Sequence, residues 1–362
     1  MAMNPFLGIF LHFIGGVAAG SFYVPFAKIK RWSWESYWLI FNLLAYVVMP
    51  WVVALAMVPE TLTVLANSDP RAILTLYGLG VIWGIGGLVF GLSLRYLGMG
   101  LGMSVSLGVC AAVGTLIPPL CMGKAEKILT TASGLTVLLG VAVCLAGIAV
   151  CGYAGIRKQR EVDEKDKTDG VKEFALLKGF VVAVIAGVTS AAMSFGIDIY
   201  GKPVGEVAVA LRVADVYQNI PVLIPLMVGN FTSNLVLCLI LNVKNRSLGD
   251  YVAGSPGRLA ANYFFAALAG VIGYQEFFWY GMGTTKLGEY QFSSWSIHLA
   301  FVIIISNLWG IFLKEWKGIQ RTTWRFVWVG IALLILCTII IGAGNYLAEY
   351  NKVPAPPSLA AE

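Results

Sequence analysis

The sequence predicts an all-α integral membrane protein in which ten transmembrane helices form two inverted five-helix repeats. The first observation is composition: 58% of the 362 residues are hydrophobic and only 12% are charged, with a mean hydropathy of +0.79. This balance excludes a soluble globular protein. The second observation is a series of apolar runs, each near the roughly 20 residues that a helix needs to cross the hydrocarbon core. The third is a set of residue matches between the two halves.

The apolar runs must be helices, because irregular backbone cannot satisfy its hydrogen bonds against lipid. The first run resembles a signal peptide near Ala18-Ala19-Gly20, but no basic residue precedes Lys28, so we interpret it as a span. Spans are expected at residues 6–25, 37–58, 72–94, 99–122 and 134–153 in the first half, and at 176–200, 216–241, 260–281, 292–313 and 324–347 in the second.

The residue matches share one offset, which makes a repeat the best explanation. Adding 190 to the numbers of Gly140 and Gly152 gives Gly330 and Gly342. Each half holds five spans, an odd number, so the second half is expected to lie upside down relative to the first, as in many secondary transporters. We therefore divide the chain into a first repeat (1–155), a charged linker (156–174), a second repeat (175–350) and a short Pro-rich tail (351–362).

The basic residues predict the orientation in the membrane. With the N-terminus outside, most of the 25 Lys and Arg residues fall on the cytoplasmic side, including those of the linker. This bias follows the positive-inside rule and leaves both termini on the outer side of the membrane. The net charge of +6 is explained by topology, so we expect no nucleic-acid partner. The sequence leaves the oligomeric state open.

Catalytic and metal-binding motifs are absent from the sequence. The six cysteines have no pair at metal or redox spacing, which favours a role as small packing residues. There is no Ser-His-Asp arrangement, HExxH motif or Walker loop. We expect no enzymatic activity, no metal and no cofactor other than a proton as coupling ion.

An acidic residue inside a predicted span is the strongest functional signal. Gln275 and Glu276 interrupt the apolar and aromatic run 271–288. An ionised Glu near the middle of a membrane helix costs roughly 2.5 to 3.5 kcal/mol, so it should face protein or water. The equivalent positions of the first half, Ile85 and Gly86, carry no such pair, which favours a functional role over a packing role.

Three residues are candidates for proton coupling: His12, His298 and Glu276. The two histidines are the only ones in the chain, and both lie inside predicted spans. Burial favours the neutral form of both residue types, so a buried histidine can also serve as a hydrogen-bonding ligand or as a packing residue. We favour the histidines slightly over Glu276 as the proton carrier.

The same helix offers polar and aromatic groups that suit a sugar. Gln275 and Trp279 lie one turn apart, as do Glu276 and Tyr280. Sugar hydroxyls need fixed hydrogen-bond partners, while the C–H face of the ring packs on an aromatic side chain. Trp and Tyr near span ends are also typical interfacial anchors. Further candidates for substrate binding are Tyr23, Asn42, Trp83, Asn230, Asn234 and Trp295.

Residues 22–35 read Phe-Tyr-Val-Pro-Phe-Ala-Lys-Ile-Lys-Arg-Trp-Ser-Trp-Glu, and this stretch resembles the L-rhamnose-proton symporter family of the drug/metabolite transporter superfamily. The likeness extends to Trp83-Gly84-Ile85-Gly86, Leu94-Arg95-Tyr96-Leu97-Gly98-Met99, Gln275 with following aromatics, His298, and Leu313-Lys314-Glu315-Trp316.

The resemblance implies ten helices, no enzymatic activity, and uptake of a deoxy sugar, L-rhamnose or a close relative, with protons across the inner membrane. Glu276 departs from the family pattern, which has an aromatic residue after the Gln. We expect alternating access around a site near the middle of the membrane. The alternatives are an exporter or facilitator of another small metabolite, or a membrane-embedded sugar sensor.

Overall fold

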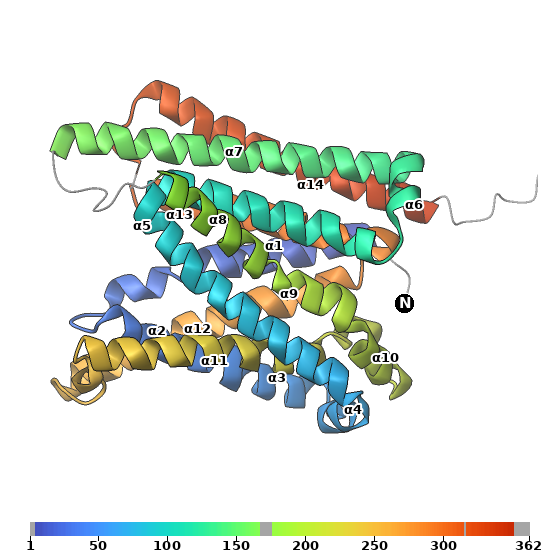
Figure 1. Ribbon diagram of the computed structural model, residues 1–362, viewed down its shortest axis with the longest axis horizontal. Coiled ribbons are helices and arrows are strands. Elements are labelled where there is room, and N and C mark those ends of the chain that lie inside the picture. The colour runs from blue at the N-terminus through green and yellow to red at the C-terminus, as the bar shows by residue number, and fades with distance from the viewer. Residues whose placement is uncertain (1–3, 167–175, 315, 351–362) are drawn as a thin grey trace, which may run out of the picture.

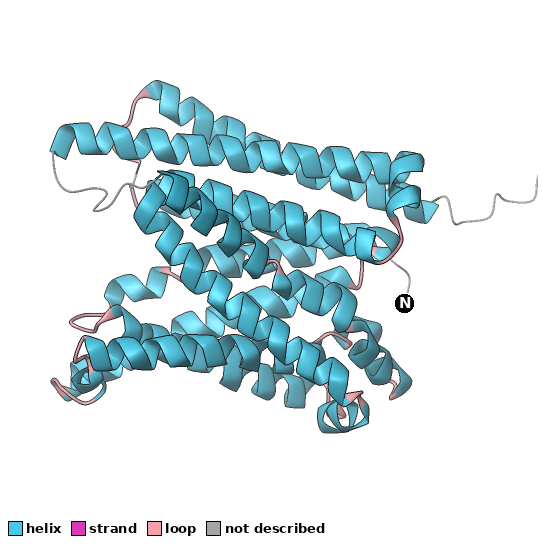
Figure 2. Cartoon of the chain, in the orientation of Figure 1, coloured by secondary structure: helices cyan, strands magenta, loops and turns pink. Residues whose placement is uncertain are grey.

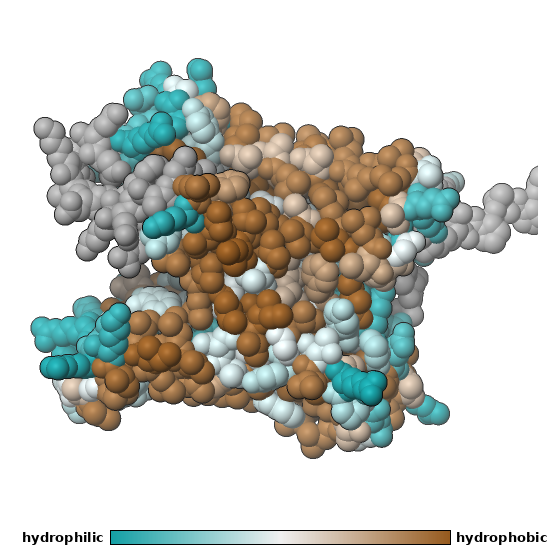
Figure 3. Space-filling model, viewed as in Figure 1, coloured by the Kyte–Doolittle hydropathy of each residue, from teal (hydrophilic) through white to brown (hydrophobic). Residues whose placement is uncertain are grey.

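The computed structural model describes residues 4–166, 176–314 and 316–350. Within these ranges all regular structure is helical (Figure 2). Nine helices in the described ranges are long and apolar enough to cross a membrane. Their sides form a broad apolar surface, and polar residues gather toward the two ends of the molecule (Figure 3). The prediction of an all-α integral membrane protein is confirmed at this level.

Every predicted span corresponds to a helical stretch. The first half comprises α1 (Pro5–Ser21), η1 (Val24–Lys28), α2 (Trp34–Leu43), η2 (Leu44–Val48), α3 (Met49–Met57), α4 (Thr61–Asn67), α5 (Pro70–Cys121), α6 (Ala125–Thr130) and α7 (Ala132–Asp166). The second half comprises α8 (Leu176–Ser190), α9 (Ala192–Phe195), η3 (Gly196–Tyr200), α10 (Lys202–Ala210), η4 (Asp215–Tyr217), α11 (Ile220–Lys244), η5 (Leu248–Tyr251), α12 (Pro256–Thr284), η6 (Gly288–Ser293), α13 (Ser294–Phe312) and α14 (Arg321–Tyr350).

Helix α5 contains two of the predicted spans and folds back on itself. Its apolar arms are Pro70–Leu94 and Gly102–Cys121. The hydroxyls of Ser93 and Ser106 lie 3.2 Å apart, whereas a straight helix would separate these residues by about 20 Å. The two arms therefore cross the molecule in opposite directions although no loop separates them (Figure 1).

Glycines allow the long helices to approach closely. A Cβ added to Gly16 of α1 would lie 2.4 Å from the Cβ of Phe301 in α13, and one added to Gly140 of α7 would lie 2.5 Å from Ile341 in α14. Any larger residue at these positions would force the helices apart. Helices α7 and α14 run side by side along one edge of the molecule, away from α2, α11 and α12 (Figure 1).

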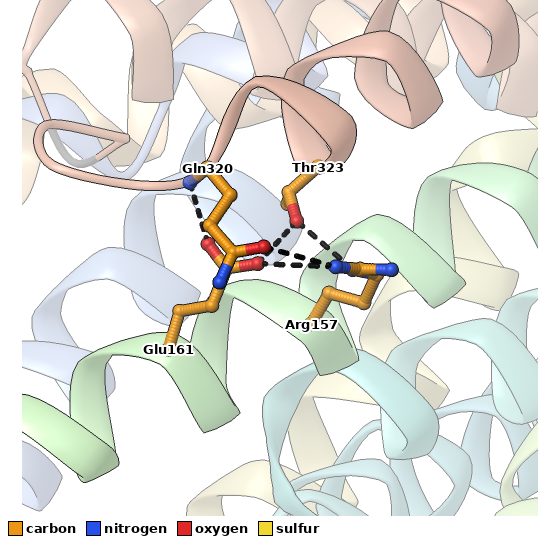
Figure 4. Close-up of polar contacts among 4 residues, drawn as sticks. All are labelled: Arg157, Glu161, Gln320 and Thr323. Carbon is orange, nitrogen blue, oxygen red and sulfur yellow. Dashed lines mark hydrogen bonds and ion pairs between the residues drawn. The ribbon is translucent and has the colours of Figure 1, made fainter.

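Helix α7 continues past its apolar part, so the linker expected at 156–174 begins as helix. Residues 167–175 and the predicted tail 351–362 lie outside the described residues. The polar end of α7 is tied to the start of α14 (Figure 4). The Glu161 carboxylate accepts hydrogen bonds from the Thr323 hydroxyl at 2.6 Å and the Gln320 backbone N–H at 2.7 Å. Arg157 Nε donates to the Thr323 hydroxyl at 3.0 Å.

Candidate functional site

The three candidate proton carriers come together where α1, α12 and α13 meet. Gly15 makes this approach possible, because a Cβ there would lie 3.0 Å from the carbonyl oxygen of Glu276 and 3.3 Å from the His298 ring. Gly283 does the same on α12, since its Cβ would lie 2.9 Å from two atoms of the His12 ring. Small residues at these contacts bring His12, Glu276 and His298 into one cluster.

Glu276 and His298 form a direct pair. His298 Nε2 lies 3.3 Å from Glu276 Oε1. The His298 side chain is 1% exposed and that of Glu276 is 17% exposed. With a proton on Nε2 the imidazole donates to the carboxylate, and with a second proton on Nδ1 the two groups form an ion pair. The arrangement can therefore hold either one or two protons.

Beside this pair lie polar atoms that have no protein partner. His12 is 0% exposed, and both of its ring nitrogens lack a hydrogen bond within the described part of the chain. The Tyr280 hydroxyl and His298 Nδ1 are in the same condition. The His12 ring centroid lies 5.3 Å from that of Tyr280 and 6.0 Å from that of His298. Buried polar atoms are almost always hydrogen-bonded, so this concentration of exceptions marks a place for water, a proton or a ligand.

Two tyrosines of the first half, Tyr23 and Tyr46, lie near enough to Glu276 to be influenced by its charge. Tyr23 is 57% exposed and stacks on Trp38 with ring centroids 6.2 Å apart. The surroundings of Glu276 thus combine the buried residues His12 and Tyr280 with the exposed Tyr23.

Several predicted substrate-binding residues are engaged in structural contacts. The Trp295 indole N–H donates to the Cys110 carbonyl at 3.1 Å, and Trp83 packs on Phe277 with centroids 4.9 Å apart. Asn234 donates to Asn230 Oδ1 at 2.9 Å.

Other predicted residues keep polar atoms available. Asn42 donates to the Trp38 carbonyl at 2.7 Å, and its Oδ1 is buried without a partner. The half-buried Gln275 side chain makes no hydrogen bond with any described residue. Trp279 is half-buried, and its Cβ would be 3.4 Å from a Cβ at Gly15.

Asp198 is a buried acidic residue that was not among the candidates predicted from the sequence. This carboxylate is 1% exposed and sits in the π-helical turn η3. Its Oδ1 accepts a hydrogen bond from Gln291 Nε2 at 3.3 Å, whereas Oδ2 has no partner among the described residues. It interacts electrostatically with Tyr280. Asp198 carries the same signal as Glu276, an acid inside a predicted span, but its place near the expected end of the span 176–200 makes it read as a boundary residue.

A surface groove of about 560 Å³ lies between α3, α4, α5 and α11, away from these residues. It is lined mainly by apolar side chains such as Trp51, Ile73 and Val228. Its lining offers few partners for sugar hydroxyls, so it does not compete with the cluster around Glu276 as a sugar site.

Comparison with known proteins identifies the family. A family model described as L-rhamnose-proton symport protein matches residues 1–347. A relative from Yersinia pestis (strain Pestoides F), named L-rhamnose-proton symporter, is 35% identical over 342 residues, which cover 93% of this chain and 97% of the relative. A relative of the same name from Pectobacterium atrosepticum is 35% identical over 345 residues, covering 94% and 98%. With all-helical architecture, long apolar spans and a match over nearly the whole length, the chain belongs to the L-rhamnose-proton symport protein family.

Proposed function

We propose that this protein takes up L-rhamnose, or a closely related deoxy sugar, together with protons. Family membership and the names of the relatives support this substrate and coupling ion. The observation that carries the proposal is the Glu276–His298 pair at 3.3 Å, in which His298, like the neighbouring His12, is buried. A carboxylate and imidazoles inside a membrane protein are expensive unless they have a function, and exchange of protons is the function for which their chemistry is suited.

In this proposal Glu276 and His298 bind the coupling proton as a unit. A proton that neutralises Glu276 changes which atom of the pair donates its hydrogen bond, and it removes the charge that Tyr23 and Tyr46 face. The sugar binds beside the pair. His12, Tyr280, Asn42 and Gln275 supply the polar atoms that have no protein partner among the described residues, and Trp279 supplies an aromatic face.

The inverted repeat is supported by reciprocal contacts between α7 and α14. Gly140 packs on Ile341, and Gly330 packs on Cys151. Adding 190 to 140 gives 330, and adding it to 151 gives 341, so the two contacts exchange places when the halves are exchanged. On this proposal α12, which carries Gln275 and Glu276, is the eighth of ten spans, and alternating access arises from movement of one half against the other.

We place the protein in the bacterial inner membrane with both termini periplasmic. The basic residues that follow α1 and α13, and those in the last part of α7, then face the cytoplasm, which satisfies the positive-inside rule. The two ends of the molecule at which polar residues gather fit the two membrane surfaces (Figure 3).

Transport in proteoliposomes tests the proposal. An inward pH gradient should drive accumulation of labelled L-rhamnose above equilibrium, and counterflow should persist without a gradient. A facilitator would equilibrate the sugar and never accumulate it, and a sensor would bind without moving it. A panel of unlabelled deoxy sugars competing in counterflow identifies the preferred substrate. Accumulation that does not respond to the pH gradient would refute proton coupling.

A further inference from the structure

The sixth apolar span is interrupted where it passes the site. The span Leu177–Tyr200 consists of α8, the four-residue helix α9 and the π-helical turn η3 that holds Asp198. Interrupted helices at membrane depth are tolerated only where they are buried in protein or line a cavity. Binding sites of secondary transporters are commonly formed at such interruptions.

Asp198 is buried with half of its hydrogen-bonding capacity unused. Its Oδ2 has no partner within the described ranges, and the one bond to Oδ1, from Gln291, is long at 3.3 Å. The charged and titratable groups that act on it are Lys202 on α10 and Tyr280 on α12. A buried carboxylate in this condition is unfavourable when ionised unless a proton or a ligand compensates it.

The charge of Lys202 compensates Asp198 only in part. Burial lowers the pKa of Lys202, and the charge of Lys124 lowers it further, while Asp198 and Glu206 oppose these effects. Lys202 lies half-buried at the start of α10, outside the apolar span. No ion pair between Lys202 and Asp198 forms in the described structure, so the carboxylate remains available to a proton.

Tyr280 lies near both Asp198 and the Glu276–His298 pair. Tyr280 interacts electrostatically with Asp198, and its ring centroid lies 5.2 Å from that of His298. The Tyr280 hydroxyl is buried without a partner and can both donate and accept a hydrogen bond. Asp198 belongs to η3, directly before α10, and accepts a hydrogen bond from Gln291 of η6. Helix α10 lies toward the end of the molecule that holds the N-terminus (Figure 1).

We propose that Asp198 is a second proton-binding residue of the transport cycle, which takes up the proton on the outer side and passes it by way of Tyr280 toward the Glu276–His298 pair. The proton binds to Oδ2 of Asp198, and after its transfer to the next group the carboxylate is ionised again. Each cycle therefore moves one proton and leaves Asp198 chemically unchanged. The inference rests on the proposed proton coupling and on the periplasmic placement of the N-terminus.

The test is Asp198→Asn, which keeps the oxygen that accepts from Gln291 and removes only the ability to titrate. Initial uptake of labelled L-rhamnose is measured in proteoliposomes at fixed inner pH while the outer pH is varied. Wild-type uptake should rise up to about tenfold per unit of outer acidification, because one unit is a tenfold change in proton concentration. Asp198→Asn should lose this dependence yet still exchange sugar in counterflow, and Asp198→Glu should restore it.

Tyr280→Phe provides a second variant, because it removes the hydroxyl and keeps the ring contacts. It should flatten the response to outer pH as Asp198→Asn does. Glu206→Gln, on the exposed face of α10, removes a nearby carboxylate and should behave as wild type. An unchanged response to outer pH in Asp198→Asn would overturn the proposal and leave coupling to the Glu276–His298 pair alone. Absence of gradient-driven accumulation in the wild type would instead refute the proposed function itself.

Discussion

Replacing Glu276 with Gln removes the charge of the buried pair with almost no change of shape. Glu276 Oε1 lies 3.3 Å from His298 Nε2, and at an effective dielectric constant of about 20 two opposite charges at such a distance attract by about 5 kcal/mol. A protonated His298 loses that attraction in the variant. We therefore expect Glu276→Gln to disable the histidine as well as the carboxylate, and to uncouple sugar movement from the proton.

The size of the effect follows from the driving force on one proton. A membrane potential of about 100 mV contributes about 2.3 kcal/mol per charge, and one pH unit contributes about 1.4 kcal/mol. Together they support roughly 500-fold accumulation of sugar per proton. Glu276→Gln should reduce accumulation to near equilibrium and preserve part of the counterflow, which needs no net proton movement.

The assay compares Glu276→Gln, His298→Gln and His12→Gln, with sugar-induced proton uptake and counterflow measured on the same vesicles. His298→Gln should resemble Glu276→Gln, because either change breaks the pair. His12→Gln should weaken sugar binding while leaving proton uptake per transported sugar intact. Wild-type accumulation by Glu276→Gln would refute the assignment of the pair as the proton carrier.

Three further predictions concern packing, stability and topology. Gly283→Ala should impair transport and cost roughly 1 to 3 kcal/mol of stability, because its Cβ would lie 2.9 Å from the His12 ring. The control is Gly87→Ala, whose Cβ would meet nothing within 4 Å. It should change neither the unfolding temperature nor the rate of sugar uptake. Glu161→Gln should lower the unfolding temperature in detergent, because it weakens charge-assisted hydrogen bonds worth about 1.5 to 3 kcal/mol. Sugar uptake per folded protein should stay unchanged. An unaltered unfolding temperature would count against a stabilising role of the network in Figure 4. A cysteine at Lys165 should react with an impermeant reagent only from the cytoplasm and one at Asp69 only from outside, and the reverse labelling would invert the proposed orientation.

The positions of the helices could be predicted from the sequence, because a long apolar run can satisfy its backbone hydrogen bonds inside a bilayer only as a helix. Even the adjacent spans within α5 were separated correctly, although the chain turns between Ser93 and Ser106 without leaving helical geometry. The sequence could not show the π-helical turns η2 and η3, because they depend on packing against neighbouring helices.

The sequence indicates candidate residues for the site but not how they are arranged. Glu276 and both histidines were recognised as groups that a membrane tolerates only for a reason. The contact between Glu276 and His298 depends on how closely α1, α12 and α13 approach one another. Gly15 permits that close approach through contacts with residues far away in the sequence, which the sequence alone does not reveal. Asp198 was missed because a carboxylate near a span end is ordinary, and only the fold shows that this one is buried.

Under the proposed inverted repeat, the reciprocal contacts of Gly140 with Ile341 and of Gly330 with Cys151 have an evolutionary consequence. Two identical five-helix chains joined in opposite orientations would make the same contact twice. Fusion of such chains into one gene lets each copy of a position change alone. Glu276 illustrates that freedom, because its counterpart Gly86 packs against the Ser190 backbone and leaves no room for an acid. In the proposed repeat the frame stays symmetric while the chemistry of the two halves diverges, and this difference would give the transported proton a direction.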